Sequence, residues 1–211
     1  MFGTFNVNSN LYSLIEIWHK EVYGSCDFLL SIRNPVIVDI GANIGAFSVF
    51  CIYKNPTATV YAYEPEENNY FLLEENVRMN NLQGSVFVEK KAVSANNKER
   101  TLYVVDKSSG KNSLVINYGH GVTQIVQSLS LAEIFSGARI DMCHLLKLDC
   151  EGSEYEIILN TPKKLFNKIQ HIILEFHDVA GHGANNLVTF LEEIGYKISV
   201  SKQHSTISAA R

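Results

Sequence analysis

The sequence lacks several features that mark particular classes of protein. Its 211 residues hold four cysteines and no Cys-x-x-Cys pair, so neither a disulfide framework nor a thiolate metal site is indicated. No apolar run approaches the roughly 18–20 residues that a membrane span needs. The first ten residues carry no charge, unlike the basic and apolar start of a signal peptide. These absences predict a protein without a membrane span in a reducing, cytoplasmic setting.

An excess of positive charge is also missing. Lys and Arg number 18 against 22 Asp and Glu, which gives a formal net charge of -4 without any basic block. A nucleic-acid partner therefore gains no electrostatic support. Hydrophobic residues make up 46% and charged residues 19%, which is ordinary for a globular chain long enough for one sizeable core.

The most informative segment that is present spans residues 36–48. A short β-branched run reaches Asp39, Gly41 and Gly45 bracket a tight turn, and an apolar helical pattern follows. An α/β chain builds a nucleotide site in this way at the end of its first strand. The spacing Gly-x-x-x-Gly, with Asn43 inside it, does not meet the dinucleotide pattern Gly-x-Gly-x-x-Gly. An acidic strand end instead suits S-adenosylmethionine, whose ammonium and sulfonium are cationic and which has no phosphate.

Strands and helices alternate along much of the chain, which predicts a doubly wound α/β sheet. We expect strands at 36–40, 59–63, 86–88, 145–149 and 172–176, and helices at 11–23, 44–54, 66–80, 153–160 and 185–194. Residues 94–140 break the rhythm and are interpreted as an antiparallel insertion over the strand ends, while 197–201 and 206–209 predict a closing hairpin. We therefore expect an N-terminal helical extension, residues 1–35, and a single domain, residues 36–211.

Polar clusters follow four of these strands, where an open α/β sheet binds its ligands. They are Asp39 with Asn43, Glu64, residues 147–152 and residues 175–178. Glu64 comes about twenty residues after the glycine turn, where a carboxylate would accept both ribose hydroxyls of an adenosine ligand. The alternative interpretation is a capping carboxylate at a strand–helix junction.

The fourth strand ends in two carboxylates, Asp149 and Glu151. At least one of them is expected to line the site, facing an ammonium or a methyl donor, although acidic residues also favour a helix N-terminus. Gly152 permits a sharp turn, and Ser153 is expected to cap the following helix. Lys147 alternates away from its neighbours and is a candidate buried ion-pair partner.

His177 is the leading candidate for a proton acceptor. With an ordinary pKa of about 6.5 it could take a hydroxyl proton, with Glu175 orienting it or acting in its place. Asp149, Glu151, Glu175 and His177 could instead gather a divalent metal through carboxylate oxygens and one imidazole. Because the sequence has no local ligand motif, we expect no metal.

Taken in order, these segments resemble the FkbM family of S-adenosylmethionine-dependent methyltransferases. The segments that carry the resemblance are 39–45, 62–65, 91–94, 147–154 and 174–177, and residues 108–114 resemble the middle segment of that family. The resemblance spans residues 36–190. It implies a Rossmann-like seven-stranded methyltransferase sheet, mostly parallel with one antiparallel strand and flanked by helices. It also implies methyl transfer to oxygen, often of a sugar or polyketide hydroxyl.

The resemblance further implies a role for each residue of the site. The cofactor residues are Asp39, Gly41, Asn43 and Gly45 for the methionine part, Glu64 for the ribose, Ala92 or Val93 for the adenine face, and Asp149 and Glu151 near the methyl donor. The catalytic candidates are His177, Asp149 and Glu175. The acceptor, a small molecule or a glycan, is the least transferable part, because acceptor recognition usually resides in additions to the core.

Three rival functions remain open at this stage. They are a nucleic-acid methyltransferase on the same core, an NAD-dependent oxidoreductase and a non-catalytic methyltransferase-like binding module. The Asp-Pro-Pro-Tyr type of strand end found in amino methyltransferases is absent, and the intact glycine turn argues against a degenerate module. Residues 106–122 could form a lid, and Tyr118 and His120 within it, with Gln124 just after it, could touch an acceptor.

Overall fold

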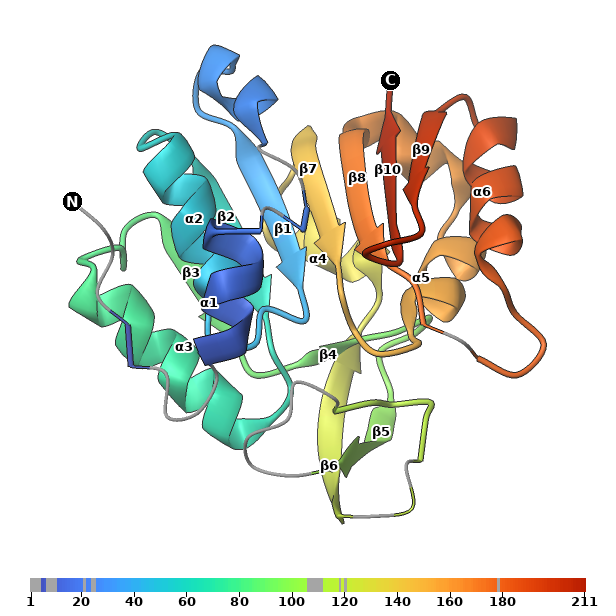
Figure 1. The fold of residues 1–211 in the computed structure, drawn as a ribbon, viewed down its shortest axis with the longest axis horizontal. Coiled ribbons are helices and arrows are strands. Elements are labelled where there is room, and N and C mark those ends of the chain that lie inside the picture. Colours follow the sequence, from blue (N-terminus) through green and yellow to red (C-terminus); the bar gives the residue numbers. More distant parts are fainter. Residues whose placement is uncertain are drawn as a thin grey trace.

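A computed structural model describes residues 5–6, 11–20, 22–23, 26–105, 112–117, 119, 121–177 and 179–211. Its centre is a seven-stranded sheet with the strand order β3-β2-β1-β7-β8-β10-β9 (Figure 1). The strands are β1 (Val36–Ile40), β2 (Thr59–Tyr63), β3 (Val86–Glu89), β7 (Cys143–Leu148), β8 (Ile169–Glu175), β9 (Lys197–Ser201) and β10 (Thr206–Ala210). Strand β10 runs antiparallel to both of its neighbours, and the other pairs are parallel. The predicted sheet, mostly parallel with one reversed strand, is confirmed.

Helices cover both faces of this sheet. They are α1 (Leu11–Trp18), α2 (Ala46–Lys54), α3 (Glu67–Met79), α4 (Leu131–Gly137), α5 (Glu154–Asn160) and α6 (Ala184–Glu193), with short 3-10 helices η1 (Asp27–Ser31) and η2 (Lys163–Lys168). Successive strand residues point to opposite faces. Ile37 and Leu145 therefore pack in the core with α2 and α3, whereas Val38 and Leu146 pack in the core with α4, α5 and α6.

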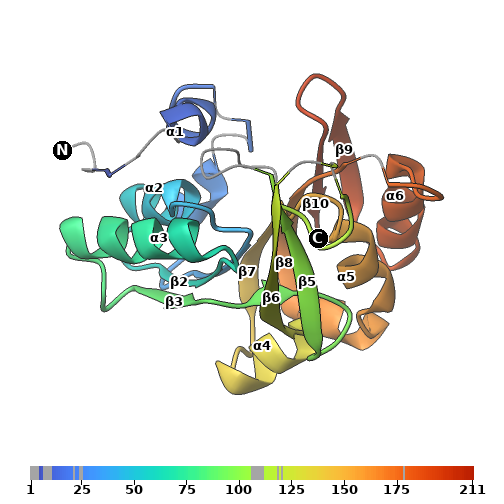
Figure 2. The same cartoon turned by 90° about the horizontal axis from the view of Figure 1, so that it is seen from below.

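A second, three-stranded sheet lies beyond the carboxyl ends of the parallel strands (Figures 1 and 2). It contains β4 (Ala92–Val93), β6 (Val122–Leu129) and β5 (Glu99–Val104), in that order. Strands β5 and β6 are antiparallel, while β4 pairs with β6 in parallel. Residues 92 and 93 therefore leave the main sheet and do not continue β3. The question of a lid lies largely outside the described residues, because 106–111, Tyr118 and His120 are not among them.

Cys26, Cys51 and Cys143 are buried, and none of the three forms a disulfide. No helix among the described residues combines the length and apolar character required to cross a membrane.

Candidate active site at the carboxyl ends of the strands

The turn after β1 is built on three residues with positive φ. Gly41 (72°), Asn43 (51°) and Gly45 (85°) all lie in the left-handed region, as the sequence predicts for the two glycines. A Cβ at Gly41 would lie 1.8 Å from the carbonyl oxygen of Asp149, and one at Gly45 would lie 2.5 Å from Leu73 Cδ1. The turn therefore packs directly on the end of β7 and on α3, with no room for side chains.

Glu64 follows β2 and is fixed by backbone amides. Its carboxylate accepts hydrogen bonds from the N–H groups of Asn43 at 2.9 Å and Glu66 at 3.0 Å. The residue is 5% exposed. Burial raises the pKa of Glu64 to about 7, although both backbone hydrogen bonds oppose this rise. The carboxyl group of Glu64 is therefore held in a fixed position, where it could accept hydrogen bonds from the hydroxyl groups of a ligand.

A pocket opens beside Glu64 and the glycine turn. It is lined by Ile40, Gly41, Asn43, Tyr63, Glu64, Pro65, Asn69, Ala92, Val93, Leu102, Asn112, Leu114, Asp149, Cys150, Glu151 and Ser153. Aliphatic side chains from β4, β5 and the segment after β5 supply apolar lining, and three carboxylates supply acidic lining. A flat apolar ring joined to a hydroxyl-bearing, cationic group fits such a lining.

The predicted cofactor residues divide into two groups. The residues that line the pocket are Gly41, Asn43, Glu64, Ala92, Val93, Asp149 and Glu151. Asp39 and Gly45 do not line it, because Asp39 is fully buried and Gly45 forms the N-cap of α2. These two residues support the turn from behind, and their contact with the methionine part of a ligand stays a prediction.

Asp39 is buried together with Lys147. The Nζ atom of Lys147 lies 3.2 Å from Asp39 Oδ1 and donates to the carbonyl oxygen of Gly41 at 2.8 Å. Ser48 Oγ donates to Asp39 Oδ2 at 2.7 Å. Burial disfavours the charged ammonium, but the carboxylates of Asp39 and Asp149 outweigh this and raise the pKa of Lys147 above its ordinary value. The buried ion pair predicted for Lys147 is confirmed, and it ties the turn to β7.

Asp149, Glu151, Glu175 and His177 form an acidic rim beside the pocket. The hydroxyl of Tyr23 donates to Asp149 Oδ2 at 2.7 Å and lies 3.5 Å from Glu175 Oε2. Burial, and after it the charge of Asp149, raises the pKa of Glu175 to about 8. The ends of β7 and β8 thus bring together two carboxylates, one of which binds a proton readily near neutral pH.

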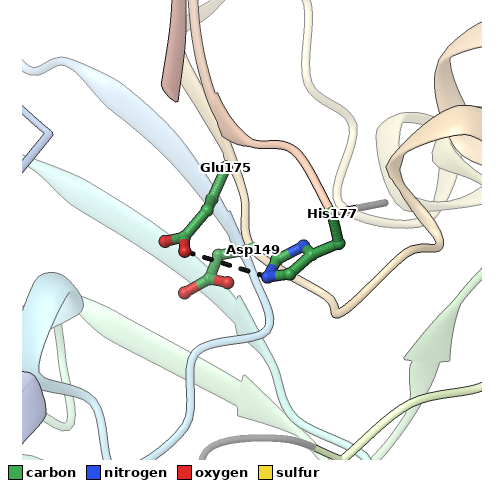
Figure 3. A group of neighbouring side chains, drawn as sticks. All are labelled: Asp149, Glu175 and His177. Atoms are coloured by element: carbon green, nitrogen blue, oxygen red, sulfur yellow. Dashed lines mark ion pairs between the residues drawn. The ribbon is translucent and has the colours of Figure 1, made fainter. Parts of the chain in front are cut away.

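His177 lies among carboxylates, and its ring points toward Glu175 (Figure 3). Its Nε2 atom is 3.5 Å from Glu151 Oε2 and 3.8 Å from Glu175 Oε1, while Nδ1 is 3.4 Å from Glu154 Oε1. Burial opposes protonation, but the close carboxylate of Glu154, followed by Glu151 and Asp149, raises the pKa of His177 to about 9. Because an imidazolium has no free lone pair, this geometry argues against His177 as the base at neutral pH.

The turn between β7 and α5 is held by Glu154. Its fully buried carboxylate accepts hydrogen bonds from the N–H groups of Cys150 at 2.8 Å and Gly152 at 2.9 Å. Glu151 (φ 52°) and Gly152 (φ 102°) both adopt left-handed conformations, so the sharp turn expected at Gly152 is present. Ser153 occupies the N-cap position without a side-chain cap. The predicted Ser153 cap is wrong, because Glu154 binds the amides of this turn instead.

Tyr23 and Ser113 hold residues of the acidic rim in place, and neither was predicted to do so. Tyr23 comes from the N-terminal segment, and a single tyrosine near the end of a helical pattern carries no local signal. Ser113, next to β5, donates its hydroxyl to the carbonyl oxygen of Glu151 and accepts the N–H of Ile116 at 2.8 Å. The small sheet is thereby fastened to the turn that carries Glu151.

Asp149, Glu175 and His177 also offer ligand atoms that lie within 4.8 Å of one another (Figure 3). Two carboxylates and an imidazole are ligands that a divalent cation accepts. The ion pairs of His177 and the hydrogen bond from Tyr23 already explain this cluster as a proton-binding network. Glu151, which the sequence adds to a possible metal set, does not belong to this group.

Comparison with known proteins identifies the family. A model of the methyltransferase FkbM domain matches residues 39–198. Methyltransferase 1 of Beauveria bassiana is 24% identical over 213 residues, covering 89% of this chain and 83% of that protein. The 31-O-demethyl-FK506 methyltransferase FkbM of Streptomyces tacrolimicus is 26% identical over 194 residues, covering 78% of this chain and 74% of that protein.

Solved structures share the fold at low sequence identity. An O-methyltransferase family protein from Burkholderia thailandensis has a TM-score of 0.54 and 10% identity, covering 97% of this chain and 59% of that one. The N-terminal domain of human METTL16, in complex with S-adenosylhomocysteine, has a TM-score of 0.52 and 13% identity, covering 100% of this chain and 72% of that one. The fold and the match over residues 39–198 agree, and the chain belongs to the FkbM family of S-adenosylmethionine-dependent methyltransferases.

Proposed function

We propose that this chain transfers a methyl group from S-adenosylmethionine to a hydroxyl oxygen of a small molecule or glycan, such as a sugar or a polyketide-like compound. The observation that carries the proposal is that one pocket extends from the fixed carboxylate of Glu64 to Asp149 and Glu151 on the acidic rim. This lining offers one ligand both carboxylate oxygens that accept hydrogen bonds from hydroxyl groups and negative charge. Such a lining suits S-adenosylmethionine, with its ribose and its sulfonium, better than it suits a dinucleotide with phosphates.

The residues of the pocket fit the cofactor part by part. Glu64 would accept hydrogen bonds from the ribose hydroxyls, while Ala92 and Val93 would contact the adenine. Asp149 and Glu151 face the cationic methionine end, where carboxylates stabilise positive charge. When bound, S-adenosylmethionine supplies an electrophilic methyl group on sulfur. The part of the protein would be to hold an acceptor oxygen beside that methyl group.

Glu175 takes the hydroxyl proton of the acceptor. A general base works best when its pKa lies near the working pH, and the pKa of Glu175 is raised to about 8. His177 lies 3.8 Å from Glu175 as an imidazolium and stabilises the carboxylate before the proton arrives. Turnover should therefore rise with pH through about 8, because Glu175 must be ionised to act.

The acidic rim favours a neutral hydroxyl acceptor over a nucleic acid. Carboxylates repel phosphates, and the net charge of -4 gives no compensating attraction. The name of the Streptomyces relative describes methylation at an oxygen of FK506, which supports the same chemistry here. Cysteines that form no disulfide support a reducing, cytoplasmic setting.

The test is transfer of a radiolabelled methyl group from S-adenosylmethionine to a panel of sugars, glycans and hydroxylated polyketides, with tRNA and DNA as further acceptors. Label on a hydroxyl compound that is lost in Glu175→Gln supports the proposal. Label on nucleic acid alone would overturn it in favour of the first rival. Cofactor binding without transfer to any member of the panel would favour a non-catalytic module.

A further inference from the structure

Tyr23 lies outside residues 39–198, yet its hydroxyl reaches the acidic rim. It is 2.7 Å from Asp149 Oδ2 and 3.5 Å from Glu175 Oε2, and the residue is 8% exposed. The ring packs edge-on against Phe47, with 5.4 Å between centroids, and Lys147 Nζ lies 5.6 Å from its centroid. These contacts hold the phenol in one orientation between the two carboxylates.

The phenol acts as a donor. Burial, followed by the charges of Asp149 and Glu175, raises the pKa of Tyr23 well above 10, so it keeps its proton at any working pH. A single O–H proton serves one carboxylate at a time. The shorter contact is with Asp149, which leaves Glu175 as the carboxylate that can take up a proton.

We propose that Tyr23 is a positioning residue that divides the roles of the two carboxylates, fixing Asp149 toward the cofactor and leaving Glu175 to accept the proton. This inference rests on the proposed methyl transfer. In that step the C–O bond forms as the C–S bond breaks, the hydroxyl proton passes to Glu175, and Tyr23 retains its own proton.

The substitution Tyr23→Phe removes the phenol oxygen, which is one of several titratable or charged groups that face Glu175. Those groups are Asp149 and Lys147 from the end of β7, Glu151 from the following turn, His177 after β8, and Tyr23 itself. In Tyr23→Phe the carboxylate of Asp149 loses the hydrogen bond that partly offsets its negative charge. This carboxylate then repels a negative charge on Glu175 more strongly. The pKa of Glu175 should then rise by about one unit.

The test needs no acceptor. Glutamate ¹³C-labelled at the side-chain carboxyl is titrated by NMR in the whole chain, and the signal of Glu175 is assigned by its loss in Glu175→Gln. Tyr23→Phe should move the midpoint of Glu175 upward by about one unit. The control is Tyr70→Phe, whose hydroxyl donates to Glu74 at 2.8 Å away from the site, and it should leave the midpoint unchanged.

An unchanged Glu175 midpoint in folded Tyr23→Phe would overturn the proposal. Folding is checked by circular dichroism, which should match that of wild type because the ring and its packing are kept. Should that variant fail to fold, Asp149→Asn keeps an oxygen acceptor for Tyr23 but removes the charge. The Glu175 midpoint should then fall, and an unchanged value would contradict the division of roles. Because neither titration depends on turnover, each remains informative if the proposed reaction fails.

Discussion

The two ends of the pocket are held in different ways. Glu64 is fixed by backbone N–H groups, those of Asn43 and Glu66, at positions that follow from the chain path. The acidic rim is instead fixed by side chains that meet from distant segments, since Tyr23 is 126 residues from Asp149 and 152 from Glu175. A binding end set by the backbone and a reactive end set by side chains should respond differently to substitution.

Charge separates the two ends further. At the binding end one carboxylate stands beside apolar walls, whereas the rim holds several carboxylates around one imidazole. Changes at the first end should therefore alter cofactor affinity. Changes at the second should alter turnover and its dependence on pH.

The largest effect should come from breaking the turn that both ends share. In Gly41→Ala the new Cβ would lie 1.8 Å from the carbonyl oxygen of Asp149, at a φ of 72° that side chains disfavour. We expect S-adenosylhomocysteine binding to fall by more than about 100-fold, or the fold to be lost. Calorimetry and circular dichroism measure this. Gly84→Ala is the control, since a Cβ there meets nothing within 4 Å; an equal loss in it would refute the steric argument.

The next effect concerns the reactive end alone. Glu175→Gln removes the proton acceptor but keeps the shape of the side chain, so turnover should fall by about 100-fold or more. Affinity for S-adenosylhomocysteine should stay within about twofold, because Glu175 does not line the cofactor pocket. Initial rates at saturating cofactor measure the first quantity and calorimetry the second. Retained turnover would return the base role to His177 or Asp149.

At the binding end the pattern should reverse. Glu64→Gln replaces one carboxylate oxygen with an amide donor facing the N–H groups of Asn43 and Glu66. We expect cofactor affinity to weaken by about tenfold, equivalent to one charged hydrogen bond, while the rate at saturating cofactor changes little. Calorimetric Kd and saturating rates separate these effects. Unaltered affinity would remove the ribose assignment.

A smaller effect should appear in the pH dependence of stability. The pKa of His177 is about 9 in the folded chain and about 6.5 when unfolded, so its contribution is complete below pH 6.5 and disappears as the pH rises through 9. The substitution His177→Gln should reduce the pH-dependent change in the free energy of unfolding by on the order of 1–3 kcal/mol. Urea unfolding at several pH values between 6 and 10 measures the slope. Identical slopes in wild type and variant would show that His177 is not held as an imidazolium.

The sequence predicts the backbone-set end better than the rim. Strands β1 and β2 begin and end at the expected residues, because short β-branched runs are bounded there by proline, glycine and polar residues. The pocket positions of Gly41, Asn43 and Glu64 follow from the ends of these two strands. A local pattern suffices where parallel neighbours align the residues.

The rim depends on tertiary contacts that no local pattern encodes. An ordinary histidine pKa predicts a base at residue 177, but the nearby carboxylates of Glu154 and Glu151 raise the pKa of this ring to about 9. Likewise Ser153 has the right type and place for a cap, yet Glu154 binds the amides of that turn. The hydroxyl of Tyr23 is placed by contacts with Phe47, Asp149 and Glu175, which lie far from it in the sequence.

The most direct test of this division is a calorimetric titration of wild type, Glu64→Gln and Glu175→Gln with S-adenosylmethionine, S-adenosylhomocysteine and NAD. We predict micromolar binding of both adenosyl ligands to wild type and Glu175→Gln, about tenfold weaker binding to Glu64→Gln, and no binding of NAD. Binding of NAD alone, or equal adenosyl affinity in all three proteins, would contradict the assignment of the pocket.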